Sequence, residues 1–356
     1  MSNPLSRLAT HAAYGASQFP RMAWYVGHGI AMRRLAQVAH GGQGGGKRPR
    51  ARTDKPTPDR RLLLADMANL LRTDIANVDA GIYPFPIDRD GAPWDVLNRS
   101  RLFFTDLPDI HRRRESGQTS EVLDSAFRGK RPRYYLQNFH FQSGGWLTDE
   151  SAQRYDTQVE VFFSGTANVM RRQALPPLHE VFAGRDPGSL RLLDVGCGTG
   201  RFLDFVKQTW PRLRVTGLDL SDAYIRAAKS HLRRRSRTGF LVASAEAIPV
   251  ADMSLDAITS IFLFHELPPQ VRRRAFAEFG RVLKPGGRLV IVDSLQTGDN
   301  PAYEGSLELF PQNFHEPYFT TYVKENFRQL AQDSGLVHRR DVPAFVSKVM
   351  VFDKPL

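Results

Sequence analysis

The sequence is poor in several features that mark particular classes of protein. It has a single cysteine, Cys197, which excludes an internal disulfide and a cysteine-rich metal site. No apolar run reaches the roughly 18 residues that a membrane-spanning helix needs, and the start lacks an apolar stretch of signal-peptide length. HExxH and paired CxxC motifs are absent as well. We therefore expect a cytoplasmic protein that holds no metal.

Acidic residues are missing from the beginning of the chain, where none occurs before Asp54. The whole chain has 49 Lys and Arg against 37 Asp and Glu, a formal net charge of +12. A basic chain is attracted to nucleic acid, to anionic membrane surfaces or to acidic substrates. Three arginine triplets, at 112–114, 233–235 and 272–274, have the simpler interpretation of solvated helix faces or helix ends.

Composition divides the 356 residues into four parts, enough for about two domains. Residues 1–40 mix apolar side chains with Arg and His, which is typical of a basic helical segment. Such a segment packs on the protein, lies on a membrane surface or serves as a targeting peptide. Residues 41–58, rich in Gly and Pro, predict a flexible linker. Residues 59–150 predict a mainly helical cap region, and residues 151–356 a second domain.

Apolar residues recur at helical spacing through the first half of the chain. One helix is predicted from Asp59, its N-cap, to the prolines at 84 and 86. Others are predicted at about 95–115 and 151–184, the latter interrupted at Pro176 and Pro177. Residues 134–146 are aromatic and favour β structure.

From residue 190 onward, short apolar runs alternate with helical segments. Alternation of this kind predicts an α/β fold with a doubly wound, mostly parallel sheet and helices on both faces. The last two strands, about 337–342 and 345–353, suit a hairpin at the sheet edge. The other predicted strands are 192–195, 215–218, 240–243, 257–261 and 288–293, and the predicted helices are 200–210, 222–235, 269–284 and 320–334.

The strongest chemical motif is Asp194-Val-Gly-Cys-Gly-Thr-Gly200, in which a buried strand ends in a glycine turn that opens a helix. Ligands of doubly wound sheets bind at such turns, and glycine lets them approach the backbone closely. The spacing is Gly-x-Gly-x-Gly, unlike the Gly-x-Gly-x-x-Gly of dinucleotide sites. The carboxylate of Asp194 would repel a pyrophosphate and attract the cationic groups of S-adenosylmethionine.

A second acidic residue, Asp219, ends the next predicted strand about 20 residues later. An acid at this place binds the ribose hydroxyls of a nucleotide cofactor. The structural alternative is an ordinary N-cap for the helix that begins near Ser221.

Four motifs in order carry a resemblance to a known family: DVGCGTG, GLDLS, SAEAIPVADMSLDAI and RVLKPGGRLVIVDS. Over about residues 150–356 the chain resembles the class I S-adenosylmethionine-dependent methyltransferases. It looks closest to the subgroup that includes quinone and other small-molecule and lipid methyltransferases. The resemblance implies a seven-stranded Rossmann-like sheet with a reversed final hairpin, and S-adenosyl-L-methionine as cofactor.

The resemblance also implies which residues bind this cofactor. Asp219 would hold the ribose and Leu220 would pack on the adenine, flanked by Ala245 and Glu246. The family often has an acid where this chain has Ser244. A helix before the domain would close over the cofactor through Tyr155 and Gln158. The amino-acid end of the cofactor would be surrounded by Asp194, Gly196, Cys197, Gly198 and Gly200.

Two segments supply candidate catalytic residues on the acceptor side. His265 and Glu266 follow the fourth strand, whose end faces the methyl group in this fold, and could orient or deprotonate a nucleophile. Their structural alternatives are a helix-capping or core histidine and an exposed carboxylate. His315, Glu316 and Tyr318 lie among aromatic residues after the fifth strand and form either a pocket wall or a lid packed by its own rings. Aromatic and amide side chains of residues 134–142 could join this pocket.

These features predict an enzyme that transfers a methyl group from S-adenosylmethionine to a small-molecule or lipid-like acceptor by in-line displacement. The basic N-terminus would contact a membrane surface where such acceptors reside. The alternative is an RNA or protein methyltransferase that binds its substrate through the basic N-terminal half. A non-catalytic module with the same fold is a third interpretation. The acceptor atom and the oligomeric state stay open.

Overall fold

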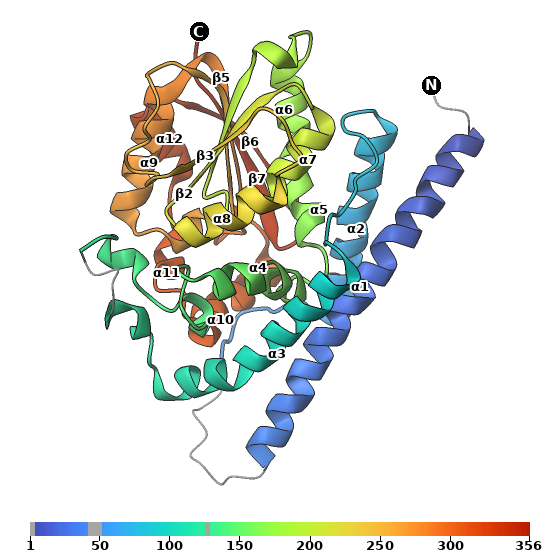
Figure 1. Ribbon diagram of the computed structural model, residues 1–356, viewed down its shortest axis with the longest axis vertical. Coiled ribbons are helices and arrows are strands. Elements are labelled where there is room, and N and C mark those ends of the chain that lie inside the picture. Colours follow the sequence, from blue (N-terminus) through green and yellow to red (C-terminus); the bar gives the residue numbers. More distant parts are fainter. Residues whose placement is uncertain (1–3, 42–51, 125–128) are drawn as a thin grey trace.

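The computed structural model describes residues 4–41, 52–124 and 129–356. A helical N-terminal region lies along one side and one end of an α/β domain (Figure 1). This region contains α1 (Pro4–Gly41), α2 (Arg60–Asp79), α3 (Pro93–Ser116) and α4 (Asp149–Phe162). The predicted N-cap of α2 is confirmed, because the Asp59 side chain accepts a hydrogen bond of 2.8 Å from the N–H of Leu62.

The α/β domain is built on a seven-stranded sheet with the order β3-β2-β1-β4-β5-β7-β6. The first five strands pair in parallel, and β7 pairs antiparallel with both β5 and β6. The predicted fold class, including the reversed final hairpin, is confirmed. The strands are β1 (Arg191–Val195), β2 (Arg214–Asp219), β3 (Thr238–Val242), β4 (Leu255–Ile261), β5 (Leu283–Ser294), β6 (Val337–Ala344) and β7 (Ser347–Asp353).

Helices cover both faces of this sheet, so its central strands are apolar on both sides. Neighbouring residues of β1 belong to different cores: Leu193 packs with α9 and α12, and Leu192 packs with α5, α6 and α7. The remaining helices are α5 (Ala167–Arg172), α6 (Leu175–Phe182), α7 (Arg201–Thr209), α8 (Asp222–His231), α9 (Pro269–Val282), α10 (Glu304–Asn313), α11 (Phe319–Tyr322) and α12 (Phe327–Asp333).

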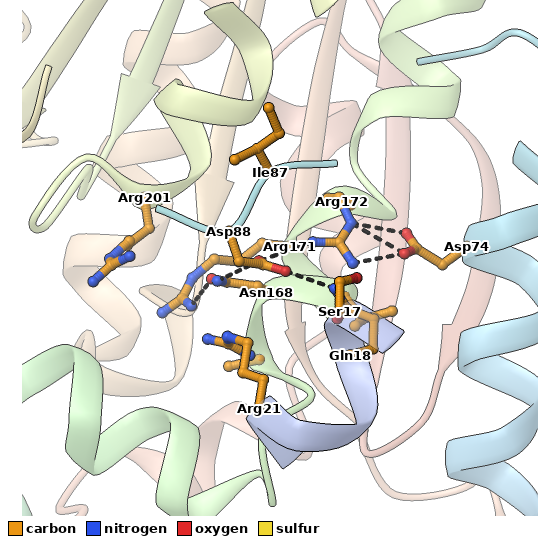
Figure 2. A network of polar contacts seen from close by, with 12 residues as sticks. Ser17, Gln18, Arg21, Asp74, Ile87, Asp88, Asn168, Arg171, Arg172 and Arg201 are labelled. Carbon is orange, nitrogen blue, oxygen red and sulfur yellow. Dashed lines mark hydrogen bonds and ion pairs between the residues drawn. The ribbon is translucent and has the colours of Figure 1, made fainter. Parts of the chain in front are cut away.

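A buried polar network fixes α1 to the rest of the protein. The fully buried guanidinium of Arg172 pairs with Asp74 at 2.6 Å, and the Tyr14 hydroxyl of α1 donates to the same carboxylate at 2.6 Å. Figure 2 shows this network, in which Arg21 of α1 lies close to Asp88 and Asn168. Within the described residues, no helix is both long and apolar enough to span a bilayer. The described part of residues 1–40 packs on the protein through contacts such as the one between Tyr14 and Asp74, in agreement with the first of the three interpretations.

Three local predictions were wrong. Residues 134–146 form 3-10 turns rather than a strand, because His140 and Phe141 adopt positive φ angles of 54° and 58°. The helix predicted from residue 151 to the prolines is divided at residues 163–166 into α4 and α5. Pro176 and Pro177 stand in the first turn of α6, the short helix expected after them, where a missing N–H costs no hydrogen bond. The helix expected at 320–334 is divided into α11 and α12.

The arginine triplets are not simply solvated, because one member of two of them is buried. Arg113 donates to the carbonyl of Phe141 at 2.7 Å, and the side chain of Arg272 is fully buried. Of the predicted linker, residues 42–51 lie outside the described residues. Residues 52–58 pack against α10, where the N–H of Gly305 donates to the Pro56 carbonyl at 2.8 Å.

Candidate active site

The glycine turn after β1 has the backbone geometry that its sequence predicts. The φ angles of Gly196, Gly198 and Gly200 are 72°, 52° and 80°. Residues other than glycine rarely adopt such positive values. A Cβ at Gly196 would come within 2.9 Å of Leu263, so the loop after β4 packs directly on the turn. The turn therefore lies against the β4 loop at Gly196.

Asp219 at the end of β2 is tied to this turn. One carboxylate oxygen accepts from the N–H of Gly198 at 2.9 Å and the other from the N–H of Ser221 at 2.9 Å. The N-cap of α8 is Ser221, whose hydroxyl accepts from Tyr224 N–H, so the N-cap alternative for Asp219 does not hold. Burial raises the pKa of Asp219. Its remaining lone pairs suit the hydroxyl donors of a ribose.

Asp194 is almost fully buried beneath the turn and accepts a hydrogen bond from the Thr259 hydroxyl at 2.7 Å. Burial, with a contribution from the charge of Asp219, raises the pKa of Asp194 to about 7. A buried carboxylate that is destabilised in this way attracts a cationic ligand. The side chain of Cys197 belongs to the core below, since a Cβ at Gly217 would lie 2.7 Å from its sulfur. Cys197 can therefore contact a cofactor only through its backbone.

The residues predicted to flank the adenine follow β2 and β3. Leu220 is half-buried, and Ala245 packs against the core on the α9 side. The Glu246 carboxylate accepts from the Tyr134 hydroxyl at 3.0 Å and pairs with Arg274 at 3.0 Å. Glu246 therefore joins the 3-10 turns of the N-terminal region to the domain.

Helix α4 covers the glycine turn, as the resemblance implies. The ring of Tyr155 lies 3.8 Å from where a Cβ of Gly198 would stand, and Gln158 follows one turn later, half-buried. Asp156 accepts from the Thr199 hydroxyl and from Arg201, each at 2.8 Å. Asp156 could not be predicted from a local motif, because its partners Thr199 and Arg201 lie more than 40 residues away.

On the acceptor side, Asp293 of β5 holds the turn that follows β4. Its carboxylate pairs with His265 Nδ1 at 2.6 Å and accepts from the N–H of Phe264 at 2.7 Å. Although burial opposes it, Asp293 raises the pKa of His265 to about 10. Burial and the nearby charge of Glu316 raise the pKa of Glu266 well above its ordinary value.

The candidate residues at 315–318 meet those at 264–266 through the aromatic segment, residues 134–142. The side-chain amide of Gln137 binds His315 Nε2 at 2.9 Å and the hydroxyl of Tyr318 at 2.9 Å. Burial lowers the pKa of His315 and raises that of Tyr318. Side-chain atoms of His140, Glu266 and Glu316 lie within 4.8 Å of one another. The structure thus brings 134–142, 264–266 and 315–318 together.

Two arginines that the sequence analysis did not single out support this arrangement. Arg272 donates to the carbonyls of Phe264 and Leu267 and to the carbonyl of Tyr318, at 3.0 to 3.2 Å. It thereby ties the β4 loop to the segment that carries Glu316. Arg171 lies over the ring of Phe262, 5.7 Å from its centroid, and its charge acts on Asp194.

Comparison with known proteins shows which proteins the α/β domain resembles. Residues 192–287 match the family model described as a methyltransferase domain. The chain is 34% identical over 149 residues to a demethylmenaquinone methyltransferase of Thermotoga maritima, covering 42% of this chain and 60% of that protein. It is 36% identical over 160 residues to a ubiquinone/menaquinone biosynthesis C-methyltransferase of Syntrophotalea carbinolica, covering 45% and 64%. A malonyl-[acyl-carrier protein] O-methyltransferase of Methylococcus capsulatus is 38% identical over 29% of this chain and 37% of its own.

The chain spans 60% and 64% of the first two of these relatives, and the residues matched by the family model, 192–287, lie in the α/β domain. The predicted kind of domain is confirmed, and S-adenosylmethionine is the cofactor that it implies. The residues present fit this cofactor. The glycines have no Cβ that would keep a ligand from the backbone of the turn. Asp219 has free lone pairs for hydroxyl donors, and the carboxylate of Asp194 favours a cation.

Proposed function

We propose that this protein transfers a methyl group from S-adenosylmethionine to a small-molecule or lipid-like acceptor by in-line displacement. The observation that carries the proposal is the contact between Asp219 and Gly198, which builds a cofactor site next to the polar cluster after β4. The relatives support this acceptor class, since their names refer to demethylmenaquinone, to ubiquinone/menaquinone biosynthesis and to malonyl-[acyl-carrier protein].

When bound, the cofactor supplies an electrophilic methyl group on a sulfonium, and the protein has to hold the acceptor in line with it. Asp219 would hold the ribose, and Asp194 would stabilise the positive charge through the turn. Tyr155 of α4 lies over Gly198 and would shield this place from water.

The acceptor would lie between the β4 loop and the aromatic segment. Asp293 fixes the ring of His265, which in turn faces Glu266 at 3.9 Å. Gln137 holds His315 and the hydroxyl of Tyr318 in place. Trp146 packs edge-to-face on Tyr155 with ring centroids 5.4 Å apart. A wall that mixes aromatic rings with a few oriented polar groups suits a ring-containing or lipid-like acceptor.

We further propose that the protein works in the cytoplasm with α1 on a membrane surface. Among the described residues, seven large apolar side chains of α1 are exposed: Leu5, Leu8, Phe19, Trp24, Val26, Ile30 and Leu35. Arg33 and Arg34 are exposed on the same helix and would attract anionic lipids. The alternative of RNA binding by the basic N-terminal half is less well supported, because several of its arginines are buried in ion pairs, such as Arg21 with Glu160.

Calorimetric titration of the full chain with S-adenosylmethionine tests the cofactor assignment. We expect one molecule to bind, and NAD⁺ at the same concentration not to compete, because Asp194 and the glycine spacing disfavour a pyrophosphate. Binding of NAD⁺ in place of S-adenosylmethionine would overturn the proposal.

A further inference from the structure

We propose that His140, Glu266 and Glu316 form a site for a first-row divalent cation, Mn²⁺ or Zn²⁺, which binds an oxygen atom of the acceptor. The proposal rests on the function proposed above and departs from the sequence analysis, which expects no metal. It identifies the acceptor as a molecule with an oxygen donor near the atom that is methylated.

The first observation is the geometry of the three side chains. Their potential ligand atoms lie within 4.8 Å of one another, and His140 Nε2 lies 3.0 Å from one oxygen of Glu316. Neighbouring ligands of a six-coordinate cation with bonds of about 2.1 Å are roughly 3 Å apart. A small inward movement of Glu266 would complete the set. One imidazole with two carboxylates suits Mn²⁺ or Zn²⁺ better than Ca²⁺.

The second observation is the environment of Glu316. Its side chain is fully buried and one carboxylate oxygen pairs with His140, yet among the described residues the other oxygen has no partner. Buried carboxylates are normally hydrogen-bonded, paired or bound to a metal. His140 supplies one cationic or neutral neighbour, but Glu266 adds a second carboxylate to the same space. A divalent cation balances both carboxylates and satisfies their lone pairs.

The third observation is backbone strain at the imidazole. His140 has φ 54° and ψ 19°, a conformation that is uncommon outside glycine and costs free energy. Hydrogen bonds hold it there, since the N–H of His140 donates to the carbonyl of His315 at 3.3 Å and Arg113 donates to the carbonyl of Phe141 at 2.7 Å. The strained turn directs the imidazole toward Glu316.

The position of the three residues gives the cation its role. Glu266 lies three residues after Leu263, which touches the glycine turn. The ring of Trp146 packs on that of His140 at 5.8 Å and on that of Tyr155 at 5.4 Å, and Tyr155 covers Gly198. The cluster therefore borders the cofactor site. His140 is about one-third exposed, so the cation has open coordination positions for water or an acceptor oxygen.

The test measures the binding of Mn²⁺ to the metal-stripped full chain. Electron paramagnetic resonance reports the concentration of free Mn²⁺ at each point of the titration. We expect one saturable site in the wild type and at least tenfold weaker binding in Glu316→Gln and His140→Asn. Asn tolerates a positive φ, so His140→Asn keeps the test valid should Glu316→Gln fail to fold. Glu308→Gln, on neighbouring α10 and paired with Lys55 at 3.3 Å, is the matched control and should bind as the wild type does.

Absence of a saturable site, or equal binding in wild type and both variants, would overturn the proposal. Titration with S-adenosylmethionine in the absence of metal separates it from the proposed function. A chain that binds the cofactor but no Mn²⁺ keeps the methyltransferase assignment and loses the metal site. A chain that binds Mn²⁺ but no cofactor keeps the metal site and loses the methyltransferase assignment.

Discussion

Asp219 and Gly198 are 21 residues apart in the sequence, yet the carboxylate of one accepts the backbone N–H of the other at 2.9 Å. The contact joins the carboxyl ends of β1 and β2 and fixes the shape of the glycine turn. Because the same carboxylate faces the cofactor site, it both builds the turn and offers acceptors to a ribose.

Asp219→Ala should therefore weaken the binding of S-adenosylmethionine without unfolding the protein. Loss of charge-assisted hydrogen bonds costs about 1.5–3 kcal/mol, which is roughly a tenfold to hundredfold increase in Kd. Calorimetry measures this change. Asp222→Ala is the matched control, because Asp222 is exposed and pairs only with Arg131 in the described contacts. An unchanged Kd in Asp219→Ala would remove Asp219 from the cofactor site.

The raised pKa of Asp194 predicts how cofactor affinity depends on pH. A cationic ligand binds the ionised carboxylate, so affinity should rise with pH through about 7. Between pH 6 and pH 8 the gain is about tenfold for one such group. Asp194→Asn should bind more weakly and lose this dependence. A wild-type affinity that is flat over this range would contradict the assigned role.

The same shift predicts the stability of the cofactor-free protein. The folded pKa of Asp194, about 7, lies above its ordinary value of 3.8, so ionisation is less favourable in the fold. The free energy of unfolding should fall as pH rises from about 4 to 7 and stay lower above that. At pH 8, Asp194→Asn should be at least as stable as the wild type, which thermal melting measures. A marked loss of stability would show that the carboxylate has a structural role.

Arg272 should be far more important for stability than its neighbour in the triplet. Its buried guanidinium binds three carbonyl oxygens as well as Glu325 at 2.8 Å. Arg272→Met leaves these acceptors unpaired and should lower the free energy of unfolding by about 3–5 kcal/mol. Exposed Arg273→Met should change it by less than about 0.5 kcal/mol. Urea denaturation of the two variants compares them, and equal midpoints would refute the assigned role of Arg272.

His265→Ala and His315→Ala should lower turnover more than cofactor affinity. His265 orients Glu266, and His315 is held with Tyr318 through Gln137, so both act on the acceptor side. Loss of a positioned polar group of this kind costs about a hundredfold in rate. Steady-state kinetics and cofactor titration separate the two effects. Unchanged kcat in both variants would place both residues in the scaffold.

Much of the fold follows from patterns that are local in the sequence. The strands of the α/β domain are short apolar runs between helical segments, and the glycine turn is a contiguous motif. The N-cap Asp59 is equally local. Residues 134–146 were mispredicted because their aromatic side chains pack on α4 and α8 rather than in a sheet. Pro176 and Pro177 mark the start of the short helix α6, as expected, whereas no proline marks the break between α4 and α5 at residues 163–166.

The parts of the site that consist of contiguous motifs could be predicted from the sequence. The parts that depend on contacts between distant segments could not. The motifs placed Asp219 beside the glycine turn, where the structure has it. His265 and His315 could be nominated, but not their meeting through Gln137. Asp156, Arg272 and the pairing of His140 with Glu316 join segments 40 to 180 residues apart. Nothing local in the sequence marks such pairs.

The most direct test of the proposed function follows a labelled methyl group from S-adenosylmethionine into a cell extract incubated with the full chain. The extract is then separated into lipid, small-metabolite, RNA and protein fractions, with Asp219→Ala as the control. We predict label in the lipid or small-metabolite fraction with the wild type and far less with the variant. Label in RNA or protein, or equal label with both chains, would contradict the proposed function.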